Sequence, residues 1–320
     1  MSRAMRAVLL ASLLALGACS TAPAPASAEA EQVAFDGDPL IDDVRILADD
    51  TMKGRAPGTP GSRMARSYIE FRFEEIGVEP IGDSYEQRFV FTAGGEGRQG
   101  VNIIGRIDGT SRSRKVMVIT AHYDHLGVVN GEIYNGADDN ASGVAGLLAI
   151  AQAFVDEPPR HDIILAAVDA EESGLRGARV LLSDPPVPLS QVALNVNLDM
   201  LSKSSREELF AAGTSHWPFL RPRLEAIAAR APVTLKIGHD GPGPEPRWDW
   251  TMLSDHGAFH EKGIPWVYFG VEDHAESHQP TDVFGTIQED FFRRSVQTVV
   301  QAVRAFDRDL DEIAREAAAR

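Results

Sequence analysis

The sequence predicts an α/β protein with a mostly parallel central sheet flanked by helices, arranged as a three-layer αβα sandwich. Four short, continuous apolar runs stand out in the 320 residues, at 115–121, 163–168, 192–198 and 264–269. Strands that are buried on both faces have this pattern. Helical stretches separate the runs, and this alternation favours parallel strands covered by helices.

The remaining elements follow in order along the chain. A helix is expected to begin at Asp38-Pro39, where a capping residue precedes a proline at the first helical position. A second helix is expected over 62–76, with Gly77 as its stop. The segments 85–92 and 101–108 are expected to be antiparallel strands at one edge of the sheet. Further helices are predicted at 141–155, 175–182, 217–230 and 288–307.

The N-terminus has the features of an export signal. Two arginines precede the apolar run 7–16, which is too short to span a bilayer, because a spanning helix needs about 20 residues. The run leads into Leu16-Gly17-Ala18-Cys19, which resembles a bacterial lipobox, where the signal is cut before a cysteine that is then lipidated. An ordinary secretory signal with a chance cysteine is the alternative.

Three segments are therefore expected. Residues 1–18 would be a lipoprotein signal peptide, and 19–37, rich in Ala, Pro, Ser and Glu, a flexible tether. Residues 38–320 would form a single folded domain. The mature protein is then expected to be exported and anchored to the bacterial cell envelope through lipidated Cys19, at the outer membrane or facing the periplasm.

Composition excludes several classes of function. Forty-seven acidic residues against 31 basic ones give a net charge of -16, which argues against a nucleic-acid partner. Cys19 is the only cysteine, so the body of the chain has no disulfide, no thiolate nucleophile and no cysteine metal site. Any metal must be held by His, Asp and Glu. No obligate protein partner is inferred.

Two short motifs are excluded by their context. Gly95 to Gly100 fits the dinucleotide pattern GxGxxG, but it leads into a strand-like segment rather than opening a helix. His260-Glu261 is not followed by the second histidine of HExxH, and no GxSxG elbow is present.

Acids and histidines gather where the apolar runs end. In an open α/β sheet the ligand crevice lies beyond the carboxyl ends of the strands, so these side chains are expected to meet there. The acidic pair Asp138-Asp139 precedes the helix at 141 on the same side. The residues after the four runs are, in turn, His122-Tyr123-Asp124-His125, Asp169-Ala170-Glu171-Glu172, Asp199, and Glu272, Asp273, His274, Glu276 and His278.

Each of these residues alone has a structural explanation. An acid after a strand is often a helix N-cap, and a lone histidine in a loop is usually solvated. Taken together, so many carboxylates at one edge would repel one another strongly unless cations neutralised them. Carboxylates mixed with imidazoles and without sulfur favour a zinc-like divalent ion, although manganese or cobalt could also bind.

Five blocks of this sequence resemble the signature blocks of the dizinc aminopeptidases. That family includes secreted bacterial leucyl aminopeptidases and is related to glutamate carboxypeptidase II. The similarity covers roughly 54–306, in the family's order, and implies a zinc exopeptidase fold in its compact form. The blocks are His122-Tyr123-Asp124, the segment from Gly136 to Gly143, the segment from Ala170 to Gly177, Asn197-Leu198-Asp199-Met200, and His278-Gln279-Pro280-Thr281-Asp282.

The resemblance implies a ligand set for two zinc ions per chain. His122 and Asp199 would bind one ion, Glu172 and His278 the other, and Asp139 would bridge them. In the family the bond after the bridging aspartate is cis, here Asp139-Asn140. Three protein ligands per ion leave positions open for water and substrate, which is typical of catalytic zinc.

Catalytic roles follow for two further carboxylates. Two metal ions can share one water and lower its pKa, so that a metal-bridging hydroxide attacks the substrate carbonyl. Glu171 is the candidate general base, because its neighbour Glu172 is committed to metal and consecutive side chains point apart. Asp124 is expected to accept the second imidazole proton of His122. Asp282 would support His278 or cap a turn.

Three functions remain open. The first is a zinc aminopeptidase acting on peptides with a free N-terminus, and the second is a glutaminyl-cyclase-like acyltransferase that uses one zinc. The third is a non-catalytic binding module. The full ligand set together with Glu171 favours the first. The aromatic residues Trp248, Trp250, Phe259, Trp266 and Tyr268 are candidates for an apolar substrate pocket, with core packing expected for at least half of them.

Overall fold

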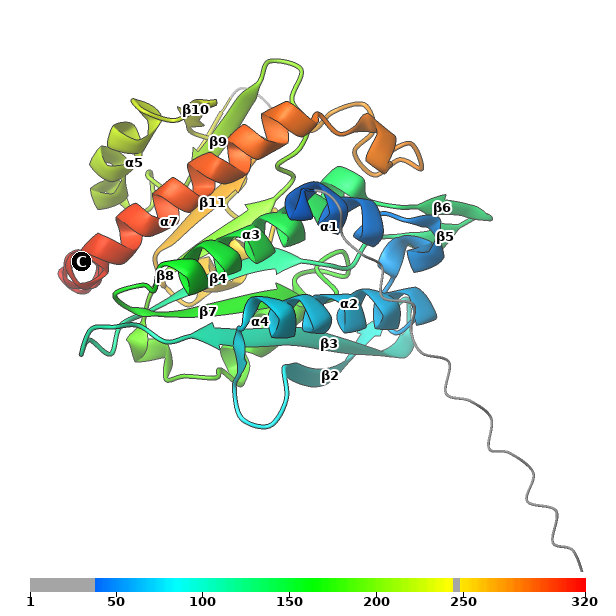
Figure 1. Cartoon of the computed structure of the whole chain (residues 1–320), viewed down its shortest axis with the longest axis horizontal. Coiled ribbons are helices and arrows are strands. Elements are labelled where there is room, and N and C mark those ends of the chain that lie inside the picture. The colour runs from blue at the N-terminus through cyan, green and yellow to red at the C-terminus, as the bar shows by residue number, and fades with distance from the viewer. Residues whose placement is uncertain (1–37, 244–247) are drawn as a thin grey trace, which may run out of the picture. The chain divides into compact units, whose positions relative to one another are not determined.

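The structure of the chain is a computed structural model that describes residues 38–243 and 248–320 (Figure 1). The expected signal peptide and tether, residues 1–37, lie outside the described residues. The described residues belong to one unit. Among the described helices, none is both long enough and apolar enough to cross a membrane.

Nine strands of the described residues form one mixed sheet. The four predicted apolar runs are β4, β7, β8 and β11, which are adjacent and mutually parallel, as expected. The strand order is β1-β3-β7-β4-β8-β11-β9-β10, and β2 pairs with β3. The bounds are β1 Glu79–Pro80, β2 Glu86–Ala93, β3 Glu96–Ile107, β4 Val116–His122, β7 Asp162–Val168, β8 Val192–Asp199, β9 Glu208–Ala212, β10 Thr234–Ile237 and β11 Trp266–Gly270.

Helices occupy both faces of this sheet, so the three-layer prediction is confirmed. Helices α1, α2, α3 and α7 cover one face, towards the viewer in Figure 1, and α4 and α6 cover the other. Asp38 caps α1 and Gly77 ends α2, as the sequence predicts. The bounds are α1 Pro39–Leu47, α2 Pro60–Ile76, α3 Gly143–Asp156, α4 Arg176–Ser183, α5 Arg221–Ala228, α6 His256–Glu261 and α7 Glu289–Ala318.

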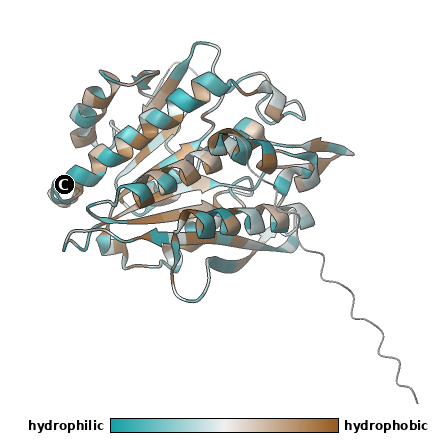
Figure 2. Cartoon of the chain, in the orientation of Figure 1, coloured by the Kyte–Doolittle hydropathy of each residue, from teal (hydrophilic) through white to brown (hydrophobic). Residues whose placement is uncertain are grey.

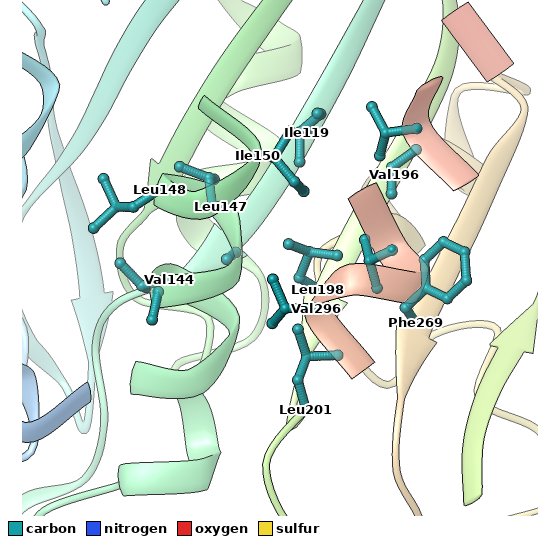
Figure 3. Packing of buried hydrophobic residues seen from close by; sticks show 14 of the residues in the cluster. Ile119, Val144, Leu147, Leu148, Ile150, Val196, Leu198, Leu201, Phe269 and Val296 are labelled. Carbon is teal, nitrogen blue, oxygen red and sulfur yellow. The ribbon is translucent and has the colours of Figure 1, made fainter. Parts of the chain in front are cut away.

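The larger core lies between the sheet and helices α3 and α7. Figure 3 shows Leu147 and Ile150 of α3 and Val296 of α7 facing the side chains of β4, β8 and β11. Every residue of β4 and β8 is buried, because both faces of these strands are covered. This explains why apolar residues predominate in the central strands, where Figure 2 is mostly brown.

Several elements differ from the expectations. Helix α7 continues to Ala318 instead of ending at 307, since Leu310 and Ile313 extend its buried stripe beyond Phe306. Strands β9 and β10 were not predicted from the sequence, nor was the small hairpin of β5 Gly127–Val129 and β6 Glu132–Tyr134. The GxGxxG segment lies in the β2–β3 turn and in β3, and therefore opens no helix.

Candidate metal centre

The predicted ligands meet at the carboxyl edge of the parallel strands. His122 is the last residue of β4 and Asp199 the last of β8. Glu171 and Glu172 lie in the turn after β7, and His278 lies in the loop after β11. The crevice that the sequence predicts at this edge is therefore present, and it receives side chains from four neighbouring strands.

One group of donors forms around His122. Its Nε2 lies 3.4 Å from Asp139 Oδ1 and 3.4 Å from Asp199 Oδ1. These three buried donor atoms are close enough together to bind one ion. Asp199 Oδ1 is buried and has no hydrogen-bond partner among the described residues, which fits an oxygen that binds a cation.

A second group forms on the other side of Asp139. Asp139 Oδ2 lies 3.0 Å from His278 Nε2, and Glu172 Oε2 lies 3.5 Å from the same nitrogen. His125 also belongs to this group, because its Nδ1 lies 2.7 Å from Glu172 Oε1. No role for His125 was predicted from the sequence. Asp139 therefore contributes an oxygen to each of the two groups.

Electrostatics in the cluster agree with a cation site. Burial alone would raise the pKa of Asp139, but His125, His278 and His122 lower it below its ordinary value. Burial raises the pKa of Asp199, against the opposing effect of His122. Burial also raises the pKa of Glu171 well above its ordinary value, with His122 opposing. Closely spaced acids of this kind need positive charge nearby, and divalent ions supply it.

Asp138 and Asp139 make different contacts in the structure. Asp138 is fully buried, and its Oδ1 accepts hydrogen bonds from the backbone and hydroxyl of Ser202 at 2.7 Å each. Its Oδ2 lies 2.9 Å from His274 Nε2. Asp138 is thus occupied by protein partners, whereas Asp139 faces the histidines of the cluster. The peptide bond Asp139-Asn140 is cis, as the family resemblance implies.

Of the two expected roles of Asp282, its contacts agree with capping a turn. Its carboxylate accepts the backbone N–H groups of Asp138 and Asp139, at 3.0 Å each. Its own carbonyl accepts the N–H of Ala137 at 3.2 Å. Asp282 therefore fastens the turn that carries Asp139 to the segment that carries His278, instead of supporting the His278 ring.

Asp124 also departs from the expected contact. His122 Nδ1 lies 3.2 Å from the backbone oxygen of Asp124 and 3.7 Å from its carboxylate Oδ1. That Oδ1 instead accepts the backbone N–H of Glu171 at 3.0 Å. The carboxylate of Asp124 thus holds the turn that presents Glu171, and its carbonyl faces the imidazole of His122.

A buried arginine supports the cluster by binding the backbone of the segments that carry its ligands. Arg55 is fully buried, and among the described residues it donates hydrogen bonds to the backbone carbonyls of Tyr123, Gly136, Leu47 and Asn135. Two of these carbonyls lie in the segments that carry His122 and Asp139. Burial lowers the pKa of Arg55 to about 10, opposed by Asp139, Asp282, Asp124 and Glu172. Arg55 therefore stays positively charged at neutral pH, close enough to these acids to interact with them.

A cavity of about 570 Å³ opens over the ligands and Glu171. Its wall combines the cluster with apolar side chains, which are Leu175, Met200, Trp250, Met252, Leu253, Tyr268 and Val271. Of the aromatic candidates, Trp250 and Tyr268 line this cavity, whereas Phe259 and Trp266 are fully buried in the core. Trp248 packs on the ring of His239, with centroids 4.3 Å apart.

Comparison with known proteins identifies the family. The model of peptidase family M28 matches residues 102–303, which is more than half of the chain and contains all the residues of the cluster. The chain belongs to peptidase family M28. The resemblance that the five sequence blocks carry is thereby confirmed.

Curated relatives of this M28 chain are distant. It is 27% identical over 201 residues to the alkaline phosphatase isozyme conversion protein of Escherichia coli, covering 59% of this chain and 56% of that protein. It is 30% identical over 155 residues to a probable zinc metalloprotease of Pyrenophora teres, covering 45% of this chain and 31% of that protein. The chain thus spans about half or less of the length of these relatives.

Solved structures share the fold over nearly their whole length. A zinc aminopeptidase from Bacillus subtilis superposes with a TM-score of 0.67 at 16% identity, covering 82% of this chain and 93% of that one. A glutaminyl cyclase from Porphyromonas gingivalis gives 0.69 at 20% identity, covering 83% and 96%. At these identities the likeness establishes the zinc exopeptidase fold, and the choice between functions depends on the site itself.

Proposed function

We propose that this chain is a zinc aminopeptidase that holds two zinc ions and removes N-terminal residues from peptides. The observation that carries the proposal is the position of Asp139 between two donor groups, each completed by a histidine and a second carboxylate. His122, Asp139 and Asp199 would hold one ion, and Asp139, Glu172 and His278 the other. Bound zinc ions would polarise the scissile carbonyl and lower the pKa of water.

Glu171 is proposed as the general base. It borders the same cavity as the ligands, and its backbone N–H is held by Asp124. Its carboxylate would accept a proton from water and pass it to the leaving amine. Asp124 and Arg55 would act indirectly, by holding the backbone of the segments that present Glu171, His122 and Asp139.

The cavity suits a peptide with a free N-terminus. The net charge of -16 attracts the ammonium group of a free N-terminus. The apolar wall around Trp250 and Leu175 would accommodate a hydrophobic first side chain.

Hydrolysis of paired peptides tests this proposal. The zinc-loaded protein should hydrolyse peptides with a free N-terminus and an apolar first residue, and N-acetylation of the same peptides should abolish cleavage. Chelation should abolish activity, and zinc or cobalt should restore it. Equal cleavage of acetylated and free peptides, or full activity in metal-free protein, would contradict the proposal. Conversion of N-terminal glutamine to pyroglutamate without hydrolysis would instead identify a cyclase.

We further propose that Cys19 carries lipid and anchors the protein to the cell envelope. The short apolar segment that ends in Leu16-Gly17-Ala18-Cys19 supports this proposal. The wild-type protein should fractionate with membranes and show an acylated N-terminal cysteine by mass spectrometry. Cys19→Ser should be soluble or unprocessed, and as active as the wild type. A soluble wild-type protein with a free thiol at its mature N-terminus would reject the proposal.

A further inference from the structure

His125 is a buried histidine in the candidate metal centre that the family resemblance leaves without a role. Its Nδ1 lies 2.7 Å from Glu172 Oε1 and 3.8 Å from Asp139 Oδ2. Its Nε2 is buried and has no hydrogen-bond partner within the described ranges 38–243 and 248–320. The ring therefore makes its polar contact through Nδ1.

Packing fixes the orientation of this ring. Gly136 lies so close that a Cβ atom at that position would be 2.6 Å from Cγ of His125. On another side the ring lies against that of His278, with centroids 5.8 Å apart. Gly136 also has a φ of +61°, a conformation that glycine adopts readily. The absence of a side chain at Gly136 thus leaves room for His125 beside Glu172.

The distance between His125 Nδ1 and Glu172 Oε1 indicates a hydrogen bond, because it is shorter than the distance between two ligands of one zinc ion. Two nitrogen or oxygen ligands of one tetrahedral zinc lie about 3.3–3.5 Å apart, because each is about 2.0–2.1 Å from the ion. The pairs His122–Asp199 and His278–Glu172, at 3.4 and 3.5 Å, have this separation, and the pair His278–Asp139, at 3.0 Å, is closer. The 2.7 Å between His125 Nδ1 and Glu172 Oε1 is shorter, and it is the length of a strong hydrogen bond to a carboxylate.

We propose that His125 is a positioning residue that orients Glu172 for metal binding. Its Nδ1–H donates to Glu172 Oε1, which leaves Oε2 facing His278 and directs that oxygen towards the ion that Asp139 and His278 share. The inference rests on the proposed two-zinc site. Partners that orient a metal ligand typically contribute 10- to 100-fold to metal affinity. One of the two ions should depend on His125, and the ion at His122 and Asp199 should not.

Zinc titration against a chromophoric chelator tests the inference on the wild type, His125→Ala and His125→Asn. Alanine should weaken one of the two zinc ions by about 10- to 100-fold and leave the other unchanged. Asparagine should restore most of the lost affinity, because its side-chain N–H₂ can replace the Nδ1–H donor. Equal losses in both variants would make His125 a direct ligand, and no loss in either would show that Glu172 is oriented without it. Both results would overturn the inference.

A matched control separates general destabilisation from loss of positioning. His161 is also buried, and its Nδ1 lies 3.1 Å from Asp307 Oδ1, on helix α7. His161→Ala should lower the thermal unfolding temperature without changing either zinc affinity. Unfolding of the His125 variants should be followed as well, so that affinities compare folded proteins. A wild-type protein that binds fewer than two zinc ions would contradict the proposed function itself, a different outcome from an unaffected His125→Ala.

Discussion

Replacing Glu171 with glutamine should lower kcat by about 10²- to 10⁴-fold, the contribution of a general base, while both zinc ions stay bound. The substitution keeps the shape of the side chain and removes only its ability to accept a proton. Glu171 borders the cavity but belongs to neither donor group. Steady-state kinetics and elemental analysis of the same preparation provide the measurement.

Glu172→Gln is the matched comparison, because it makes the same chemical change one residue along the chain. Glu172 lies within 3.5 Å of His278 Nε2, so a neutral amide there should weaken one zinc ion. The two variants should therefore differ in metal content and not only in rate. Metal lost from the Glu171 variant and retained in the Glu172 variant would reverse the two assignments, and near-normal rates in both would reject the active site.

Arg55→Met should lower the free energy of unfolding by about 3–5 kcal/mol, as expected when a buried network loses its charged member. Four backbone carbonyls would lose their hydrogen-bond donor, and the acids of the metal centre would lose a buried positive charge nearby. Urea unfolding of the chelated protein measures the loss without a contribution from bound metal.

Arg179→Met is the control for this prediction. Arg179 also pairs with an acid, Glu261, but the two side chains are 42% and 41% exposed. A solvent-exposed ion pair contributes about 0–1 kcal/mol, so this variant should unfold almost like the wild type. Similar unfolding free energies for the two variants would contradict the supporting role of Arg55.

Continuous apolar runs predicted the central sheet well, because β4, β7, β8 and β11 are covered on both faces and nearly all of their residues are buried. Strands β9 and β10 were not predicted from the sequence. They contain five and four residues, and the burial of β10 alternates, so short-range pattern does not separate them from loops. The predicted end of helix α7 was too early for a related reason. Its last buried residues, Leu310 and Ile313, lie among charged residues in the sequence, so the apolar pattern is hard to follow there.

The donor residues could be predicted from the sequence because they follow strand ends and match a family pattern. The structure brings all five together at one edge of the sheet. Arg55 and His125 could not be assigned in the same way. The role of Arg55 depends on carbonyls as many as 81 residues away, and that of His125 on one hydrogen bond to Glu172. Asp282 likewise acts on backbone N–H groups more than 140 residues earlier.

The metal content of the wild-type protein tests the central claim most directly. Protein reconstituted with zinc and freed of excess metal should contain two zinc ions per chain by elemental analysis, because Asp139 serves two donor groups. Asp139→Asn should lose affinity for both ions together, whereas variants of Asp199 or Glu172 should each affect one. One zinc ion per chain, or none, in active wild-type protein would contradict the two-metal account.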